Sequence, residues 1–172
     1  ILGLGTLGTA CGIALKRLGF NVRGWSRREK RVDGIICFYG DDQVDSSLMD
    51  ADIVVLLLPD TPLTQNILNQ HTLNLLKRGA FVLNPGRGPL IDDDALLAAL
   101  ETGQIEHATL DVFRIEPLPK NHQYWSNNKV TVIPHKASET RPKTASQVIA
   151  MNIERAENGQ ELLYLVDREN GY

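Results

Sequence analysis

The chain opens with three glycines, Gly3, Gly5 and Gly8, whose spacing constrains the fold more than any other feature of the sequence. The first residues, ILGLGTLG, read as the end of a strand that turns directly into a helix over residues 7–18. In a dinucleotide-binding turn, the first glycine allows the tight turn, the second lets the backbone approach a pyrophosphate, and the third lets helix and strand pack closely. The free N–H groups at the start of the helix then face the pyrophosphate. The opening therefore predicts a nucleotide-binding α/β domain, although such a turn can also be purely structural.

Apolar runs that suit strands alternate with stretches of helical period along the rest of the chain. We expect strands at residues 20–25, 52–59, 80–86, 107–113 and 129–135, and helices at residues 72–79, 92–100 and 138–158, the last interrupted near Pro142. The run at 52–59, DIVVLLLP, is apolar without alternation, which is typical of a strand buried on both faces. The sequence therefore predicts an α/β fold with one doubly wound parallel sheet, a Rossmann NAD(P)-binding domain.

The composition fits one globular domain and excludes several functions. Of the 172 residues, 42% are hydrophobic, and the net charge of -3 argues against a general nucleic-acid or membrane-surface binder. Cys11 and Cys37 have neither metal-site nor disulfide spacing, which indicates reduced thiols in a cytoplasmic protein. Only Ile1 and Leu2 precede Gly3, whereas a strand usually has about five or six residues. We therefore expect the chain to be a fragment of a longer protein or a processed chain.

The residues after the second expected strand predict which dinucleotide the chain prefers. An acidic residue about 20 positions after the glycine turn usually binds the ribose 2′-hydroxyl of NAD, but here the sequence is WSRREK, with Ser26, Arg27 and Arg28 at this place. Arginine presents a planar, charged fork that matches a phosphate, and no acid stands at position 26 to repel one. We therefore expect NADP(H) to be preferred over NAD(H), unless both arginines are simply solvated surface charges.

Three side chains with catalytic potential follow three of the expected strands. Arg87 lies in NPGRGPLID, Glu116 follows LDVF, and His135 ends VTVIPH. Because doubly wound folds bind their ligands at the carboxyl ends of the strands, these groups should meet at one edge of the sheet. Taken singly, each has an ordinary explanation as a salt bridge, a surface acid or a buried histidine. Together at one edge, they predict an active site.

The motifs GLGTLG, LLLPDTPLT, NPGRGPLID, LDVFRIEPLP and IPHKASETRP occur in an order that resembles the D-isomer-specific 2-hydroxyacid dehydrogenase family, over nearly the whole chain. Within that family, SETRP and the ending VDRENGY, with Tyr172 as the expected C-terminus, are most similar to the glyoxylate/hydroxypyruvate reductase A group. The resemblance implies that Arg87, Glu116 and His135 form the catalytic set. His135 is then the proton donor, Glu116 its partner, and Arg87 the group that holds the substrate carboxylate.

The resemblance also implies a set of cofactor contacts. Asp111 is expected to contact the nicotinamide carboxamide, and Leu58, Pro59 and Thr64 to lie along the cofactor. The full expected set is Gly3, Gly5, Thr6, Leu7, Gly8, Ser26, Arg27, Arg28, Leu58, Pro59, Thr64, Pro85, Gly86, Arg87, Asp111 and His135, with no metal.

The implied reaction is the NADPH-dependent reduction of a small 2-oxo acid, glyoxylate or hydroxypyruvate, by a homodimer joined through the coenzyme domain. In the family a substrate domain precedes the glycine turn, and that domain is absent from this chain. Residues 1–172 then correspond to the dinucleotide-binding domain, with residues 143–172 forming a C-terminal helix and tail.

Two alternatives remain open at this point. The same fold also serves non-catalytic NAD(P)-sensing modules, although the presence of all three catalytic-type residues favours an enzyme. The other alternative is a different D-2-hydroxyacid dehydrogenase. Formate dehydrogenases of the family carry Gln where Glu116 stands, and the Ser26–Arg28 stretch argues against an NAD-dependent phosphoglycerate dehydrogenase.

Overall fold

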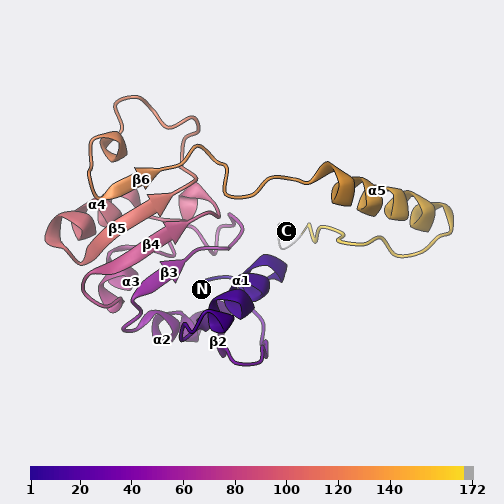
Figure 1. Ribbon diagram of the computed structural model, residues 1–172, viewed down its shortest axis with the longest axis horizontal. Coiled ribbons are helices and arrows are strands. Elements are labelled where there is room, and N and C mark those ends of the chain that lie inside the picture. The colour runs from indigo at the N-terminus through magenta and orange to yellow at the C-terminus, as the bar shows by residue number, and fades with distance from the viewer. Residues whose placement is uncertain (169–172) are drawn as a thin grey trace. The chain divides into compact units, whose positions relative to one another are not determined.

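The computed structural model describes residues 1–168, in which residues 1–135 form one compact unit and the residues from Lys136 onward form another. The first unit holds the helices α1 (Thr6–Arg17), α2 (Val44–Leu48), α3 (Gln70–Leu75) and α4 (Asp93–Thr102), and the strands β1 (Arg23–Ser26), β2 (Ile36–Tyr39), β3 (Ile53–Val55), β4 (Ala80–Asn84), β5 (Ile105–Leu110) and β6 (Val130–Val132) (Figure 1). The second unit holds α5 (Pro142–Glu157). Tyr172, expected to be the C-terminus, lies outside the described residues.

The first segment of the chain lies in the middle of the parallel strands. β1 pairs with β2, and β3, β4, β5 and β6 pair in that order, all in parallel. Leu2 joins the two sets, because it forms bridges to Trp25 on one side and to Leu56 on the other. Its N–H donates to the carbonyl oxygen of Val55 at 2.9 Å, and its own carbonyl oxygen accepts from the N–H of Leu57 at 2.8 Å. The strand order therefore reverses at Leu2, as in a doubly wound dinucleotide-binding sheet, and the predicted fold class is confirmed.

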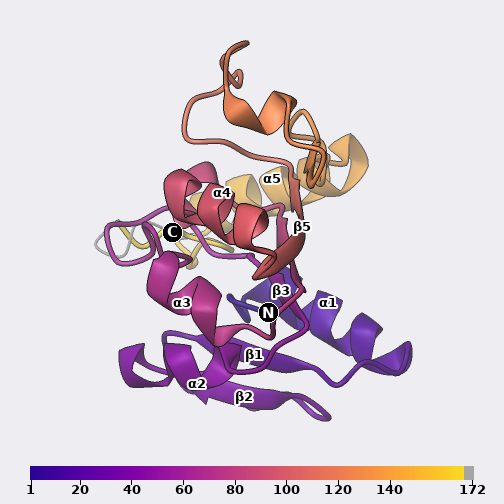
Figure 2. The ribbon, with the colours of Figure 1, turned by 90° about the vertical axis from the view of Figure 1, so that its left-hand side faces the viewer.

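The hydrophobic core lies between one face of the β3–β6 strands and the helices α3 and α4. Val54, Val82 and Ala108 are neighbours in register across β3, β4 and β5, and each is at most 1% exposed. They belong to the same buried cluster as Leu96 and Leu100 of α4. Figure 2 shows α3 and α4 side by side, and the two helices are in contact. This packing fixes the strand ends from which the functional loops start.

The prediction that residues 52–59 form a strand buried on both faces is wrong. Regular pairing covers only the three residues of β3, and Ile53 and Phe81, neighbours on the opposite face, are 44% and 43% exposed. The helix α1 packs instead near Val22 and Ile35, beside β1 and β2, where a Cβ added to its Gly12 would meet both side chains. An uninterrupted apolar run shows that a segment is hydrophobic, but it does not show which neighbour covers each face.

Two of the predicted helices begin at least two residues away from their expected start, for identifiable reasons. The helix expected at 72–79 lies at Gln70–Leu75, because the side chain of Asn69 accepts from the backbone of Thr72 and the Thr72 hydroxyl accepts from the N–H of Asn69. This reciprocal capping box starts the helix earlier than its apolar residues suggest. The helix expected at 138–158 begins at Pro142 rather than being interrupted there. Proline suits a first helical position, because the N–H that proline lacks would have no intrahelical partner there.

Neither β2 nor α2 was predicted from the sequence pattern. β2 consists of four residues, of which Ile36 is 63% and Tyr39 is 42% exposed, so it is a short strand at the edge and not a buried apolar run. α2 has only five residues, which is too short for a helical period to be recognised.

Candidate functional site

The glycine turn lies at the carboxyl end of the central Leu2 segment. Gly3 has a φ of 108°, which favours glycine, and a Cβ there would lie 2.5 Å from the carbonyl oxygen of Leu57. A Cβ on Gly8 would lie 1.8 Å from the carbonyl oxygen of Gly3, so α1 approaches the turn more closely than any side chain permits. A Cβ on Gly5, at the N-cap of α1, would meet no atom within 4 Å. The start of α1 is therefore open to an anionic ligand.

Positive charge gathers in the stretch after β1, and part of it reaches the glycine turn. Ser26, the last residue of β1, is 8% exposed, and its hydroxyl donates to the carbonyl oxygen of Arg28 at 2.8 Å. Arg27 is half-buried and Arg28 is exposed. The Lys30 ammonium group donates to the carbonyl oxygen of Leu4, within the turn. Lys30 was not among the residues predicted for the site; the motif WSRREK contains it, but the contact depends on how the chain folds back across 26 positions.

The loop after β3 adjoins the glycine turn and is shaped from within by Thr64. The Thr64 side chain is buried, and its hydroxyl donates to the carbonyl oxygen of Pro59 at 2.7 Å and accepts from the N–H of Thr61 at 2.9 Å. A Cβ on Gly3 would lie 3.2 Å from the side chain of Leu58. The loop therefore lies beside the turn, while the Thr64 hydroxyl holds the shape of the loop through these bonds.

Asn84, at the end of β4, shapes the loop that carries Arg87. Its side chain is 1% exposed; the amide oxygen accepts from the N–H of Gly86 at 3.1 Å, and the amide nitrogen donates to the carbonyl oxygen of Arg87 at 2.9 Å. A Cβ on Gly86 would lie 2.8 Å from the carbonyl oxygen of Leu56, so this loop passes beside the end of β3. The exposed Arg87 guanidinium donates to the carbonyl oxygen of Gly86 at 2.6 Å. Arg87 forms no ion pair within residues 1–168, so the salt-bridge explanation finds no support there.

The predicted histidine and glutamate are in direct contact. His135 Nδ1 and Glu116 Oε2 are 2.8 Å apart, and Glu116 Oε1 accepts from the N–H of Phe113 at 2.9 Å. Because an ionised carboxylate only accepts hydrogen bonds, Nδ1 carries a hydrogen and Nε2 is the nitrogen left to exchange a proton. The His135 side chain is 52% exposed, so it is not a buried core histidine. Its φ of 51° is uncommon for a residue other than glycine, a form of strain that concentrates at functional sites.

The surroundings of Glu116 favour its ionised form. Partial burial acts to raise the pKa of its carboxyl group, but hydrogen bonds from the Phe113 N–H and the His135 ring, together with the charges of His135 and Arg87, hold that pKa below the usual value of 4.5. The three predicted catalytic side chains therefore share one edge of the sheet and act on one another electrostatically.

Asp111 links the ends of three strands through its backbone. Its N–H donates to the carbonyl oxygen of Asn84 at 3.1 Å, and its carbonyl oxygen accepts from the N–H of His135 at 2.9 Å. Its side chain is 3% exposed. Asp111 therefore fixes the positions at which the loops after β4, β5 and β6 begin.

The remaining predicted contacts lie along the same edge. Thr6 and Leu7 are exposed in the first turn of α1, and Pro85 is half-buried in the loop after β4. Every predicted site residue thus belongs to the unit of residues 1–135. In the described part of the chain, no group of three His, Cys, Asp or Glu side chains is placed to hold a metal ion, and no helix is long and apolar enough to cross a membrane.

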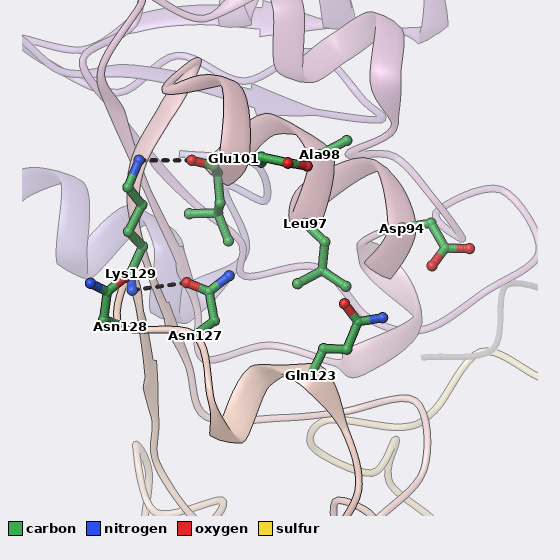
Figure 3. A pocket seen from close by; sticks show the side chains of 9 residues that line it. Asp94, Leu97, Ala98, Glu101, Gln123, Asn127, Asn128 and Lys129 are labelled. Atoms are coloured by element: carbon green, nitrogen blue, oxygen red, sulfur yellow. Dashed lines mark hydrogen bonds between the residues drawn. The ribbon is translucent and has the colours of Figure 1, made fainter.

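A hollow lies between α4 and the segment that contains Gln123 and Asn127 (Figure 3). It is lined by Asp94, Leu97, Ala98, Leu100, Glu101, Gln123, Asn127, Asn128 and Lys129. The Lys129 ammonium group donates to the carbonyl oxygen of Leu100 at 2.8 Å. None of the predicted site residues lines the hollow, and we assign it no role in the reaction.

Comparison with known proteins gives a consistent result. Residues 1–137 match the family model of the D-isomer specific 2-hydroxyacid dehydrogenase, NAD binding domain. The chain is 45% identical over all 172 residues to glyoxylate/hydroxypyruvate reductase A of Serratia proteamaculans and 41% identical to that of Yersinia enterocolitica. It spans 55% of the length of each of these relatives.

Solved structures show the same relationship. A D-isomer specific 2-hydroxyacid dehydrogenase of Xanthobacter autotrophicus, in complex with NADPH and MES, has a TM-score of 0.96 and 47% identity over 99% of this chain and 71% of that one. An NADPH-dependent glyoxylate/hydroxypyruvate reductase of Sinorhizobium meliloti, in complex with NADP and sulfate, has a TM-score of 0.94 and 33% identity over 99% of this chain and 55% of that one.

Proposed function

Because the chain belongs to the family of D-isomer-specific 2-hydroxyacid dehydrogenases, we propose that it is the coenzyme-binding part of a reductase that converts a small 2-oxo acid into a 2-hydroxy acid with NADPH. The contact between His135 and Glu116, at the same sheet edge as Arg87 and the glycine turn, carries this proposal. The names of the relatives from Serratia and Yersinia favour glyoxylate and hydroxypyruvate as substrates.

The residues around the glycine turn fit a dinucleotide phosphate. The backbone at Gly5 is open and the start of α1 offers N–H groups. We propose that Arg27 and Arg28, with Lys30 beside the turn, bind the 2′-phosphate and pyrophosphate and so select NADP(H) over NAD(H). When bound, the nicotinamide cofactor supplies the hydride of the reaction.

The side chains of this chain then supply position, charge and a proton. Arg87 can hold the substrate carboxylate with two parallel hydrogen bonds, because its guanidinium is exposed and forms no ion pair within residues 1–168. His135 can donate a proton from Nε2 to the alkoxide that forms as the carbonyl is reduced. The Glu116 carboxylate fixes the ring through Nδ1 and stabilises positive charge on it.

We also propose that the enzyme is a cytoplasmic homodimer joined through this unit. Ile53 and Phe81 form a partly exposed apolar pair on the face of the strands opposite Val54 and Val82, the kind of surface that subunit contacts bury. Cys11 and Cys37 are free thiols, as in proteins of reducing compartments.

The experiment that tests this function is steady-state kinetics of the enzyme that contains this chain, with glyoxylate and hydroxypyruvate as substrates. We expect His135→Ala to lower kcat by at least about 100-fold, the usual contribution of general acid catalysis. His71→Ala is the matched control, because His71 lies on α3 and, like His135, bonds to a carboxylate, that of Asp45 at 2.8 Å, but is not among the predicted site residues. Full turnover in His135→Ala would contradict the assignment, and cofactor binding without any turnover in the unmodified enzyme would favour the sensing module.

A further inference from the structure

We propose that Arg114 is a positioning residue that clamps the loop bearing Glu116 (residues 111–116, the Glu116 loop) to the loop bearing Arg87 (residues 85–91, the Arg87 loop). The clamp holds the proton-donating pair at a fixed spacing from the guanidinium that binds the substrate carboxylate. The inference rests on the proposed function, since the roles of Arg87, Glu116 and His135 come from it.

The two loops lie backbone against backbone. Gly88 follows Arg87 and is buried; a Cβ on Gly88 would lie 1.9 Å from the carbonyl carbon of Phe113, 2.1 Å from its oxygen and 2.4 Å from the nitrogen of Arg114. The peptide between Phe113 and Arg114 therefore rests directly on Gly88. Any movement of one loop must be matched by the other.

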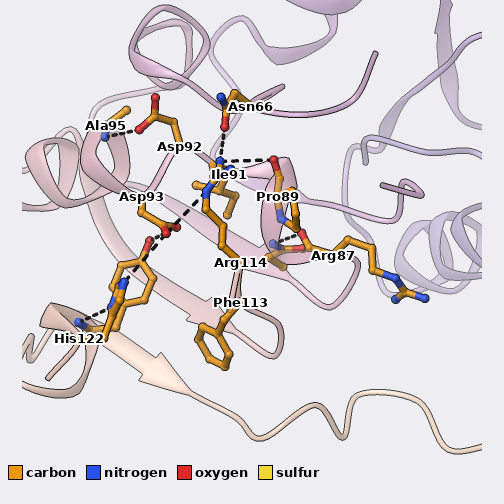
Figure 4. A network of polar contacts seen from close by, with 12 residues as sticks. Asn66, Arg87, Pro89, Ile91, Asp92, Asp93, Ala95, Phe113, Arg114 and His122 are labelled. Carbon is orange, nitrogen blue, oxygen red and sulfur yellow. Dashed lines mark hydrogen bonds and ion pairs between the residues drawn. The ribbon is translucent and has the colours of Figure 1, made fainter. Parts of the chain in front are cut away.

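The Arg114 side chain crosses from the Glu116 loop to the Arg87 loop (Figure 4). Its guanidinium donates to the carbonyl oxygen of Ile91 and to the side-chain oxygen of Asn66, and it lies 3.5 Å from the carbonyl oxygen of Pro89. Its Nε is 3.7 Å from a carboxylate oxygen of Asp93. The three oxygen contacts are made by one guanidinium nitrogen, Nη2, while the Asp93 contact is made by Nε. A guanidinium can face both sets of partners at once because its nitrogens are fixed in one plane, whereas a lysine has a single charged nitrogen.

The far side of the clamp is itself well anchored. Asp93 lies in the first turn of α4, and its carboxylate accepts from the hydroxyl of Tyr124 at 2.9 Å. Tyr124 is 2% exposed, and its ring lies 4.4 Å from that of His122. Arg114 therefore ties the Glu116 loop to α4 and to the buried aromatic ring behind it.

The near side of the clamp bears directly on the catalytic pair. Phe113, immediately before Arg114, donates its N–H to Glu116 Oε1, and the other carboxylate oxygen of Glu116 bonds to His135. The Arg87 side chain points away from the Arg114 contacts, which leaves its guanidinium available to substrate (Figure 4). Arg114 thus acts on the reacting groups through the backbone of the two loops and not by contact with substrate.

The test compares Arg114→Ala, Arg114→Lys and Arg78→Ala. Arg78 is a matched control, because its guanidinium also donates to a carbonyl oxygen, that of Thr102 at 2.7 Å, but at the other end of α4. In the enzyme containing this chain, we expect Arg114→Ala to lower kcat/KM for the 2-oxo acid by roughly 10- to 100-fold, as a displacement of about 1 Å in a catalytic group does. NADPH affinity should stay unchanged, Arg114→Lys should recover part of the loss, and Arg78→Ala should behave as the unmodified enzyme.

A second readout follows the carboxyl group of Glu116 by ¹³C NMR in this chain, with Glu116→Gln assigning the signal. We expect the pKa of Glu116 to rise toward its usual value in Arg114→Ala but not in Arg78→Ala, because the Phe113 N–H is no longer held in place. The clamp is refuted if kcat/KM and the titration both match the unmodified protein, or if NADPH affinity and thermal stability fall in step with kcat/KM. Lack of activity in the unmodified enzyme refutes the proposed function instead, while the NMR titration still decides on the clamp.

Discussion

Adding one methyl group at Gly5 or at Gly8 should separate the two roles of the glycine turn. At Gly5 the backbone has φ -67° and ψ -166°, an extended conformation open to alanine, and the new Cβ meets nothing within 4 Å. At Gly8 the new Cβ would lie 1.8 Å from the carbonyl oxygen of Gly3. The same change therefore meets open space at one position and backbone at the other.

The size of each effect follows from these distances. A carbon and a carbonyl oxygen need about 3.3 Å, so Gly8→Ala must push α1 away from Gly3 by roughly 1.5 Å. Overpacking usually costs about 1–3 kcal/mol, and because both groups here are backbone we expect a loss of at least ~3 kcal/mol, or roughly 6–12 °C in Tm. Gly5→Ala should change the free energy of unfolding by less than about 1 kcal/mol. Its methyl group would stand where the pyrophosphate approaches, and we expect NADPH affinity to fall at least about tenfold, or ~1.4 kcal/mol.

Urea denaturation and calorimetric titration with NADPH, on both variants and the unmodified chain, measure the two effects separately. If Gly5→Ala binds NADPH as tightly as the unmodified chain, the pyrophosphate does not approach Gly5. If Gly8→Ala unfolds at the same urea concentration as the unmodified chain, α1 does not depend on close contact with Gly3.

Three further predictions concern the elements that hold the site. Asp92→Ala removes the N-cap hydrogen bond from the Ala95 N–H, 3.1 Å long, and should lower the free energy of unfolding in urea by about 1 kcal/mol. If Asp92→Asn lowers the free energy of unfolding as much as Asp92→Ala does, capping is not the reason. Asn84→Ala leaves one donor and one acceptor of the Arg87 loop without partners and should cost roughly 3 kcal/mol in the same assay; a loss below about 1 kcal/mol would show that water replaces the amide. The folded-state pKa of Glu116 is lowered, so its ionised form stabilises the fold above pH 4.5 and loses this contribution as the pH falls through the folded value. The free energy of unfolding, measured over a series of pH values, should therefore fall less steeply toward acid pH in Glu116→Gln than in the unmodified chain. The same dependence on pH in both proteins would contradict the pairing of Glu116 with His135.

The geometry that the sequence predicted well is local or follows from strand order. Gly3 and Gly8 occupy positions where a Cβ meets backbone, a requirement that glycine spacing expresses directly. The contact between Glu116 and His135 joins residues 19 apart; strand order predicted that both lie at one edge of the sheet, and the resemblance to the dehydrogenase family implied the pairing. The exposed position of His135 also agrees with a catalytic role and not with a buried core residue.

Contacts that depend on the path of a loop could not be predicted. Lys30 reaches Leu4 and Arg114 reaches Asn66 only because loops fold back across the sheet edge, and no spacing rule describes those paths. The exposure of Ile53 was missed for a different reason. Hydrophobicity reports what a strand can bury, whereas exposure depends on which other element lies against it.

The measurement that tests the central claim most directly is calorimetric titration of this chain with NADPH and with NADH, repeated on an Arg27→Ala/Arg28→Ala double variant. We expect NADPH to bind at least about tenfold more tightly than NADH, a difference of ~1.4 kcal/mol, and the double variant to lose this preference. Equal affinity for the two cofactors, or a preference that survives in the double variant, would contradict the assignment of Arg27 and Arg28. Failure of both cofactors to bind would contradict the claim that this chain by itself forms the cofactor site.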